Sequence, residues 1–411
     1  MRLDGFSNPA GVDVVINSLQ GLLGLNAEGQ VTIGLGGDFD SSVEIIASFA
    51  PFSTEVPDGR RVDIARRAII DSKKAKSLSA GDVLARILVG QKEYLQQPLT
   101  PFVLLSSLSI RYSPELKTVR LADALLTFSS STSARFKLPS TALRGAVHYG
   151  PAPTDYTSVR VRVSARDFMS AGELAIDRLD FVRAIWNLFR NRSRWRISLG
   201  NRGRPINDIL LGPIHTLHHP DGAPASEIFW WEPSYVEPHS PVDLTQDLSE
   251  MRTFERWVRA HLAASSMRLE LEGILNRYVR ALDERDLNPA LVTLWGVLED
   301  LTGTRTGDTH KVTVRRAAFV FKDGEFRKLV LNHLREWRNR IVHEGRGTGE
   351  GERMVQELQH HVAVLLGFLL SNAKTFRSFD EVGRFLDLPP DPDILSRRIK
   401  HLQKAYRMCE S

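Results

Sequence analysis

The chain has 411 residues, with 54 Lys and Arg against 49 Asp and Glu, and 42% of its residues are hydrophobic. This length suggests two or three domains, and the composition excludes wholesale disorder and collagen-like architecture. The single cysteine, Cys409, excludes an intramolecular disulfide and a Cys-based zinc site, and it favours a cytoplasmic location.

Residues 1–245 are predicted to form a strand-rich α+β domain. Short apolar or alternating segments, separated by Gly, Pro, Ser and Asn, predict strands at 31–35, 42–49, 102–112, 118–128 and 158–163. Helices are predicted at 62–91 and 174–189. A proline-rich passage, 212–243, is expected to lead out of this domain.

Residues 246–411 are predicted to form an all-α bundle, so the expected fold class is α+β with two domains. Helical periodicity covers 248–282, 288–303, 310–321, 325–344, 354–375 and 394–408. Asn288 is expected to cap one helix and Gly303 to end it, and Ser378 with Glu381 has capping-box spacing. No apolar run approaches the ~20 residues that span a bilayer, so no membrane partner is expected.

The helix predicted at 325–344 carries the most informative motif. Its expected apolar stripe comprises Phe326, Leu329, Val330, Leu334, Trp337, Ile341 and Val342. An Arg followed five residues later by a His occurs three times, at Arg256/His261, Arg305/His310 and Arg338/His343. Spacing cannot choose among them, but only His343 ends a strongly amphipathic helix and has an Asn, Asn339, beside its Arg.

The sequence Arg338-Asn339-x-x-x-His343 resembles the HEPN superfamily, and more narrowly its ApeA-like group. Residues 291–303, 195–198, 211–222 and 229–233 also resemble that group. The resemblance implies a metal-independent endoribonuclease without a cofactor, active as a homodimer with its site at the dimer interface. It implies a role in anti-phage defence or toxin-like RNA cleavage, with the N-terminal domain responding to a phage-derived or cellular trigger.

The residue types of this motif suit metal-free RNA cleavage. His343 can act as base or acid because an unperturbed imidazole has a pKa of about 6.5. Arg338 supplies a permanent charge for the phosphorane, and Asn339 can bind phosphate or orient the ring. Arg335 and Arg340 are expected to contact neighbouring RNA phosphates. On an ideal helix Arg338 and His343 lie about 140° apart, so two copies are expected to build one site.

Other interpretations of the same residues remain open. The arginines of the motif can be a solvated helix face, with His343 a C-terminal cation that meets the helix dipole. The bundle can also be a non-catalytic HEPN module that recognises a protein, nucleotide or nucleic acid. A third alternative is a regulator that binds DNA through an arginine-rich segment.

Three further groups of residues are functional candidates. Glu299 is a candidate for orienting Arg338, with a surface carboxylate as the alternative. The segment 183–204 has seven arginines and no acid, and is either an RNA-binding surface that includes Arg194 and Arg196 or a basic outer face over buried aromatics. His215, His218, His219 and Asp221 have no metal-type spacing, so a turn or packing role is expected and no metal site is predicted.

Overall fold

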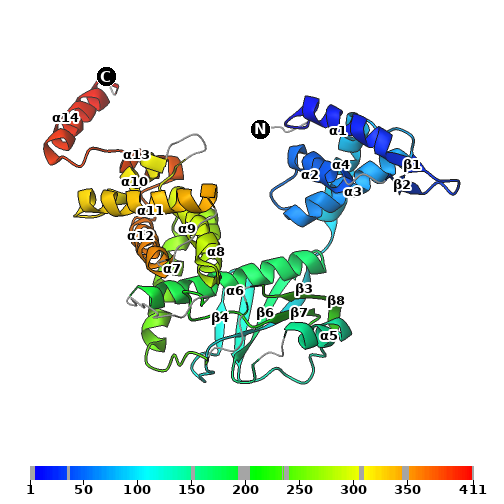
Figure 1. The fold of residues 1–411 in the computed structure, drawn as a ribbon, viewed down its shortest axis with the longest axis horizontal. Helices are drawn as coiled ribbons and strands as arrows, with labels where there is room; N and C mark the ends of the chain where they lie inside the picture. Colours follow the sequence, from blue (N-terminus) through cyan, green and yellow to red (C-terminus); the bar gives the residue numbers. More distant parts are fainter. Residues whose placement is uncertain are drawn as a thin grey trace. The chain divides into compact units, whose positions relative to one another are not determined.

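The computed structural model describes residues 5–34, 38–149, 153–192, 204–233, 235, 240–304, 310–344 and 351–409. The chain is a mixed α+β protein that is 58% helical. It separates into two compact units, of which one contains residues 1–103 and 162–174 and the other residues 104–161 and 175–411 (Figure 1). The boundary predicted at residue 245 lies inside the second unit, which contains most of the sheet together with the C-terminal helices.

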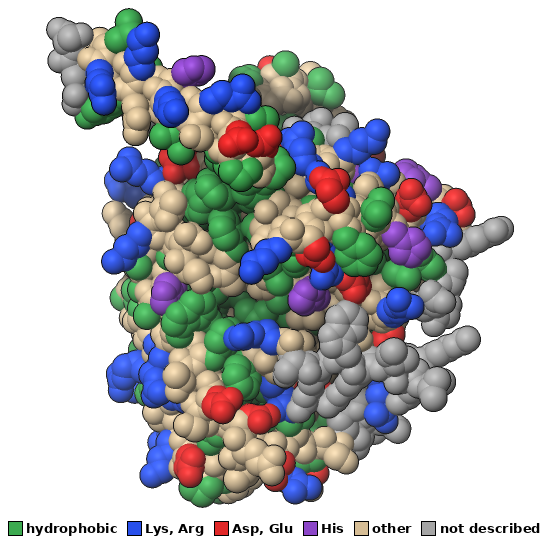
Figure 2. Space-filling model, turned by 90° about the vertical axis from the view of Figure 1, so that its left-hand side faces the viewer, with side chains coloured by type: hydrophobic (Ala, Val, Ile, Leu, Met, Phe, Trp, Pro, Cys, Tyr) green, Lys and Arg blue, Asp and Glu red, His purple; other side chains and the backbone are tan. Residues whose placement is uncertain are grey.

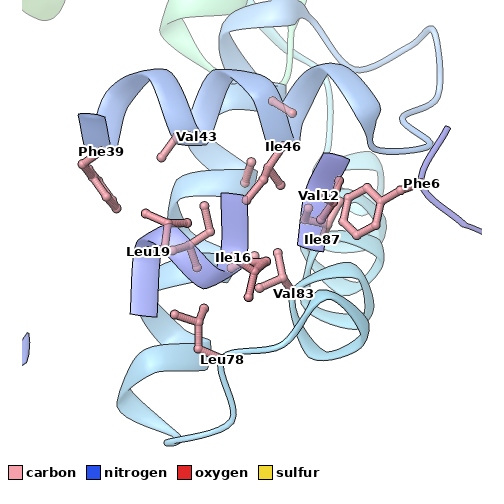
Figure 3. Packing of buried hydrophobic residues seen from close by; sticks show 14 of the residues in the cluster. Phe6, Val12, Ile16, Leu19, Phe39, Val43, Ile46, Leu78, Val83 and Ile87 are labelled. Carbon is pink, nitrogen blue, oxygen red and sulfur yellow. The ribbon is translucent and has the colours of Figure 1, made fainter. Parts of the chain in front are cut away.

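The first unit is a helical cluster with one small hairpin. Its elements are α1 (Pro9–Leu22), β1 (Leu23–Leu25), β2 (Val31–Ile33), α2 (Asp38–Phe49), α3 (Asp58–Lys74) and α4 (Ala80–Gln96). Figure 3 shows side chains from α1, α2 and α4 pointing into one apolar cluster, among them Val12, Ile46 and Ile87. Burial of these apolar faces holds the short helices together, because isolated helices of this length are marginal in water.

Two predictions for this region were wrong. The segment 42–49, expected as a strand, belongs to helix α2, which buries Val43, Ile46 and Ala47 on one helical face. The helix expected over 62–91 is two helices, because Ser79 accepts a hydrogen bond from the Asp82 amide and starts α4 anew. The N-terminal 103 residues are therefore mainly helical rather than strand-rich.

The sheet has six antiparallel strands in the order β4-β5-β6-β3-β7-β8. These strands are β3 (Thr100–Leu108), β4 (Thr118–Arg120), β5 (Ala124–Ser129), β6 (Thr157–Ala165), β7 (Ile214–His218) and β8 (Pro224–Trp231). The alternation expected at 158–163 is seen in β6, where Val159, Val161 and Val163 are buried and Arg162 is exposed. Two further helices occur between strands, α5 (Ser140–Tyr149) and the long α6 (Phe168–Asn191).

Eight helices follow the sheet strands. They are α7 (Leu248–Ala263), α8 (Arg268–Asp283), α9 (Leu287–Leu301), α10 (His310–Ala318), α11 (Gly324–Glu344), α12 (Gly351–Ser371), α13 (Phe379–Leu386) and α14 (Pro392–Cys409). The expected 248–282 helix is thus two helices. Asp286, not Asn288, caps α9, since its carboxylate accepts from the Asn288 amide. Gly303 follows that helix with φ of +61°, as expected of a C-terminal glycine.

The bundle is built around α9, which packs between α8 and α12. No helix among the described residues is long and apolar enough to cross a bilayer. The apolar stripe predicted for α11 is only partly buried: Leu334 and Trp337 face the core, whereas Phe326 and Leu329 are 58% and 69% exposed. Leu331, outside the predicted stripe, is buried instead.

One buried imidazole in this bundle makes stability depend on pH. His361 of α12 is fully buried and donates Nδ1–H to the Glu357 carbonyl oxygen at 2.8 Å, while its Nε2 has no hydrogen-bond partner. Burial, assisted by the nearby His360 and Arg327, lowers the pKa of His361 to about 4. Between pH 6.5 and 4 the unfolded chain therefore binds a proton that the folded chain does not.

We expect the free energy of unfolding to fall by about 3 kcal/mol from this group as pH drops from above 6.5 to 4. His361→Gln should flatten this part of the stability profile. Urea unfolding at several pH values measures it, with His401→Gln on exposed α14 as the control. If the free energy of unfolding of the His361→Gln variant fell between pH 6.5 and 4 as steeply as that of the wild type, His361 would not be the group that causes this pH dependence.

Candidate functional site

Helix α11 carries the Arg338–His343 motif near its C-terminal end. The helix is anchored through Leu331, Leu334 and Trp337, and it packs mainly against α10 and α9. Arg338 and Asn339 are half-buried, and His343 is exposed one residue before the helix ends. The helix was expected here, and it places Asn339 and His343 about 40° apart on one side.

Arg338 lies on a different side of α11 from His343. Its Nη1 donates to Asn339 Oδ1 at 3.3 Å, and its Nε is buried without a hydrogen-bond partner. Among the described residues, no hydrogen bond joins Arg338 to His343. One copy of the chain therefore separates the two groups that the proposed chemistry needs, as the helical geometry predicted.

The cations of this helix end have no carboxylate partner among the described residues. Arg335, Arg338 and Arg340 form no ion pair there, although Arg340 lies over the Trp337 ring at 4.8 Å. At the other end of α11, in contrast, Arg327 is paired with both Asp323 and Glu357. Among the described residues, the arginines of α11 without an ion pair therefore lie toward the end that bears His343, where Glu336 and Glu344 are also exposed. Guanidinium groups that are not paired within the chain suit a polyanionic ligand.

Glu299 lies on α9 but has partners other than Arg338. Its Oε1 accepts from Trp295 Nε1 at 2.9 Å and from His310 Nδ1 at 2.7 Å. His310, where the predicted helix 310–321 begins, is the first residue of α10 and is partly exposed. Sequence reasoning missed this carboxylate–imidazole pair, because the two residues lie on different helices, α9 and α10, and meet only in the folded chain.

The described arginines of segment 183–204 lie in two different environments. Arg183 and Arg190 are buried in ion pairs, Arg183 with Asp180 and Asp283 and Arg190 with Asp208 and Asp247. For these two arginines the expectation of an RNA-binding surface was wrong. Arg192 is exposed and lies over the Phe254 ring. Arg194 and Arg196 lie outside the described residues.

A buried polar network joins α6, α8 and β8. Arg183 has no exposed side-chain surface, and its Nη2 lies 2.7 Å from both Asp180 Oδ1 and Asp283 Oδ2. Arg280 pairs with Asp180 and, at 2.6 Å, with Glu232. Burial lowers the pKa of Arg183, but the two carboxylates outweigh it and raise the pKa overall. The network is structural, because its charges are paired and removed from solvent.

The histidines of β7 also have packing roles. His215 Nδ1 lies 2.9 Å from Ser106 Oγ, and His218 Nε2 lies 2.9 Å from Thr216 Oγ1. Burial lowers the pKa of His218, so its ring is neutral near pH 7. Among the described residues no group of three His, Cys, Asp or Glu side chains is arranged to hold a metal ion.

Comparison with known proteins assigns the chain to no family. No family model, curated protein or solved structure matches the chain. The HEPN resemblance and the activity it implies therefore stay predictions.

Proposed function

We propose that the chain is a metal-independent endoribonuclease whose active site is built from two copies of α11. The observation that supports this most is the set of arginines without an ion pair, Arg335, Arg338 and Arg340, on the same helix end as the exposed His343. Exposed phosphates are the ligands that such arginines attract, and an imidazole next to them can transfer protons.

The reaction needs no group beyond those of the chain and the RNA. His343 of one copy removes the proton from a ribose 2′-hydroxyl, whose oxygen attacks the adjacent phosphorus. The bond from phosphorus to the 5′-oxygen breaks, and the second His343 gives that oxygen a proton. Arg338 from each copy stabilises the charge on the phosphorane. The products are a 2′,3′-cyclic phosphate and a 5′-hydroxyl.

The exposed apolar side chains of α11 support the pairing of two copies. Leu329 lies about 40° from His343 around the helix and about 21 Å from it along the axis, so a parallel pairing of two α11 helices through this side would place the two His343 side chains on the same side of the dimer. Large exposed apolar side chains that cluster on one side often mark an interface.

Leu329→Asp is expected to convert the dimer to a monomer and to reduce RNA cleavage at least tenfold, because a charge would be buried in the interface. Light scattering after size exclusion measures the mass. Leu269→Asp is the matched control, since Leu269 of α8 is 74% exposed. A Leu329→Asp protein with the mass of the wild type would contradict this interface.

The proposed biological role is defence against phage or toxin-like RNA cleavage, with the N-terminal residues responding to a phage-derived or cellular trigger. This role is the one that the resemblance to the ApeA-like HEPN group implies. Expression in cells with and without phage infection tests it, since growth arrest confined to infected cells is expected. Equal growth arrest in both cultures would contradict control by a phage-derived trigger.

A direct test of activity is incubation of the purified protein with total RNA in EDTA. Cleavage in the chelator is expected. RNA binding without cleavage would instead favour the non-catalytic binding module, and it would overturn the enzymatic proposal.

A further inference from the structure

Helix α14 exposes most of its apolar side chains to solvent. Each of the other helices that follow the sheet strands has buried residues, whereas α14 has none. Ile399, Leu402 and Tyr406 are 53%, 69% and 64% exposed. The helix is seen at the top of the view in Figure 2, where hydrophobic, basic and His side chains all reach its surface. It therefore has an apolar surface that the described part of the chain does not bury.

The apolar side chains of α14 form one stripe along the helix. The stripe consists of residues spaced four, three and four apart, which are Leu395, Ile399, Leu402 and Tyr406. At 100° per residue these side chains fall within about 60° of the helix circumference. The stripe covers fewer than two heptads, whereas a coiled coil needs about three or more. A coiled coil with a second copy is therefore not the expected partner of this stripe.

The rest of the surface of α14 is strongly basic. Against the one carboxylate of the helix, that of Asp393, stand the cations of Arg397, Arg398, Lys400, Lys404 and Arg407. All of these cations are exposed, and none forms an ion pair with a described carboxylate. Arg398 and Arg407 flank the stripe on its two sides, about 40° and 80° from its edges. Two copies of α14 side by side would bring like charges together, so an anionic partner is favoured over a second copy.

The side chains of α14 suit a lipid surface. An arginine beside the stripe can lay its apolar stem along it and place its guanidinium against headgroup phosphates. The ring of Tyr406 has an apolar body and a polar hydroxyl, which suits the boundary between acyl chains and headgroups. The helix is 18 residues long, so its stripe can lie flat on a membrane without crossing it.

We propose that α14 binds flat on an anionic lipid surface, with its apolar stripe among the upper acyl chains and its flanking arginines against the headgroup phosphates. A basic amphipathic helix is typical of proteins that lie in the plane of a membrane interface. This mode differs from crossing a bilayer, for which no described helix is long and apolar enough. It replaces the expectation of no membrane partner, which considered spanning segments alone. The inference goes beyond the proposed cleavage and does not depend on it.

Co-sedimentation of the full chain with vesicles tests the proposal. Vesicles of phosphatidylcholine and phosphatidylglycerol in equal parts should bind the protein at least about tenfold more tightly than vesicles of phosphatidylcholine alone. Cys409 gives a second measurement, because it is exposed, is the single cysteine of the chain and lies about 20° from Leu402 around the helix. A polarity-sensitive dye on Cys409 should shift its emission to shorter wavelength when the anionic vesicles are added.

The double variant Ile399→Gln/Leu402→Gln separates insertion from adsorption through charge, because it removes apolar surface and keeps every cation. Its binding to the anionic vesicles should be at least about tenfold weaker than that of the wild type. Neither side chain is buried, so the variant creates no cavity. The matched control is Val14→Gln/Leu269→Gln, two apolar side chains of α1 and α8 that are 69% and 74% exposed, and it should bind like the wild type.

Three results would overturn the proposal. They are no binding of the wild type to the anionic vesicles, equal binding to both kinds of vesicle, and equal binding by the wild type and the α14 double variant. If the wild type does not bind vesicles and the double variant has a lower mass in light scattering, the stripe serves a second copy instead. His343→Ala should bind vesicles like the wild type, which separates this proposal from the proposed nuclease.

Discussion

His343→Ala is expected to reduce RNA cleavage by at least about 10³-fold while leaving the fold and the dimer intact. A general acid or base typically contributes 10²- to 10⁴-fold, and in the proposed dimer the substitution removes both the base and the acid. His343 is exposed at the end of α11, so its loss creates no cavity and removes no described hydrogen bond. Initial rates on a labelled RNA, with circular dichroism and light scattering of the same samples, measure the effect.

His333→Ala is the matched control for this prediction, because His333 is also exposed on α11 but lies outside the motif. Its cleavage rate should equal that of the wild type. If the His343 variant cuts RNA as fast as the wild type, the catalytic assignment is wrong. Equal losses in both variants would indicate a general effect of altering α11 rather than a catalytic role of His343.

Arg183→Ala is expected to lower the free energy of unfolding of the second unit by about 3–5 kcal/mol. The substitution removes the guanidinium that lies between Asp180 and Asp283, and it leaves two carboxylates in a buried site. Burial already raises the pKa of Asp283, so the loss should shrink in acid, where this carboxyl group can be protonated. All seven tryptophans of the chain belong to the second unit, so their fluorescence during urea unfolding reports this unit alone.

Exposed Arg256 of α7 provides the control for this measurement. Arg256→Ala should change the free energy of unfolding by no more than about 0.5 kcal/mol, which is usual for surface positions. A similarly small change for Arg183→Ala would show that the buried network contributes little to stability.

The sequence predicted elements well where one periodicity was strong and caps were clear. Helix α11 and strand β6 are examples, since each has a regular apolar pattern over its length. The segment 42–49 was misread because a short apolar run fits a strand and a helix equally, and only packing against α1 and α3 decides. Phe326 and Leu329 fit the stripe of α11, yet both remain more than half exposed to solvent in the described part of the chain.

The environment of the candidate site was less predictable than its position on α11. The angle between Arg338 and His343 follows from helix geometry alone. The partners of charged side chains do not: Arg183 meets Asp283, which is 100 residues further along the chain, and Glu299 of α9 meets His310 of α10. Contacts of this kind depend on how helices pack, which local sequence does not specify.

The most direct test of the proposed chemistry is mass spectrometry of the ends produced from one RNA oligonucleotide in EDTA, beside the same oligonucleotide made of 2′-deoxynucleotides. We predict a 2′,3′-cyclic phosphate and a 5′-hydroxyl from the RNA, and no cleavage of the deoxy strand, because the attacking oxygen is the ribose 2′-oxygen. Products with a 3′-hydroxyl and a 5′-phosphate, cleavage of the deoxy strand, or intact RNA would contradict the account.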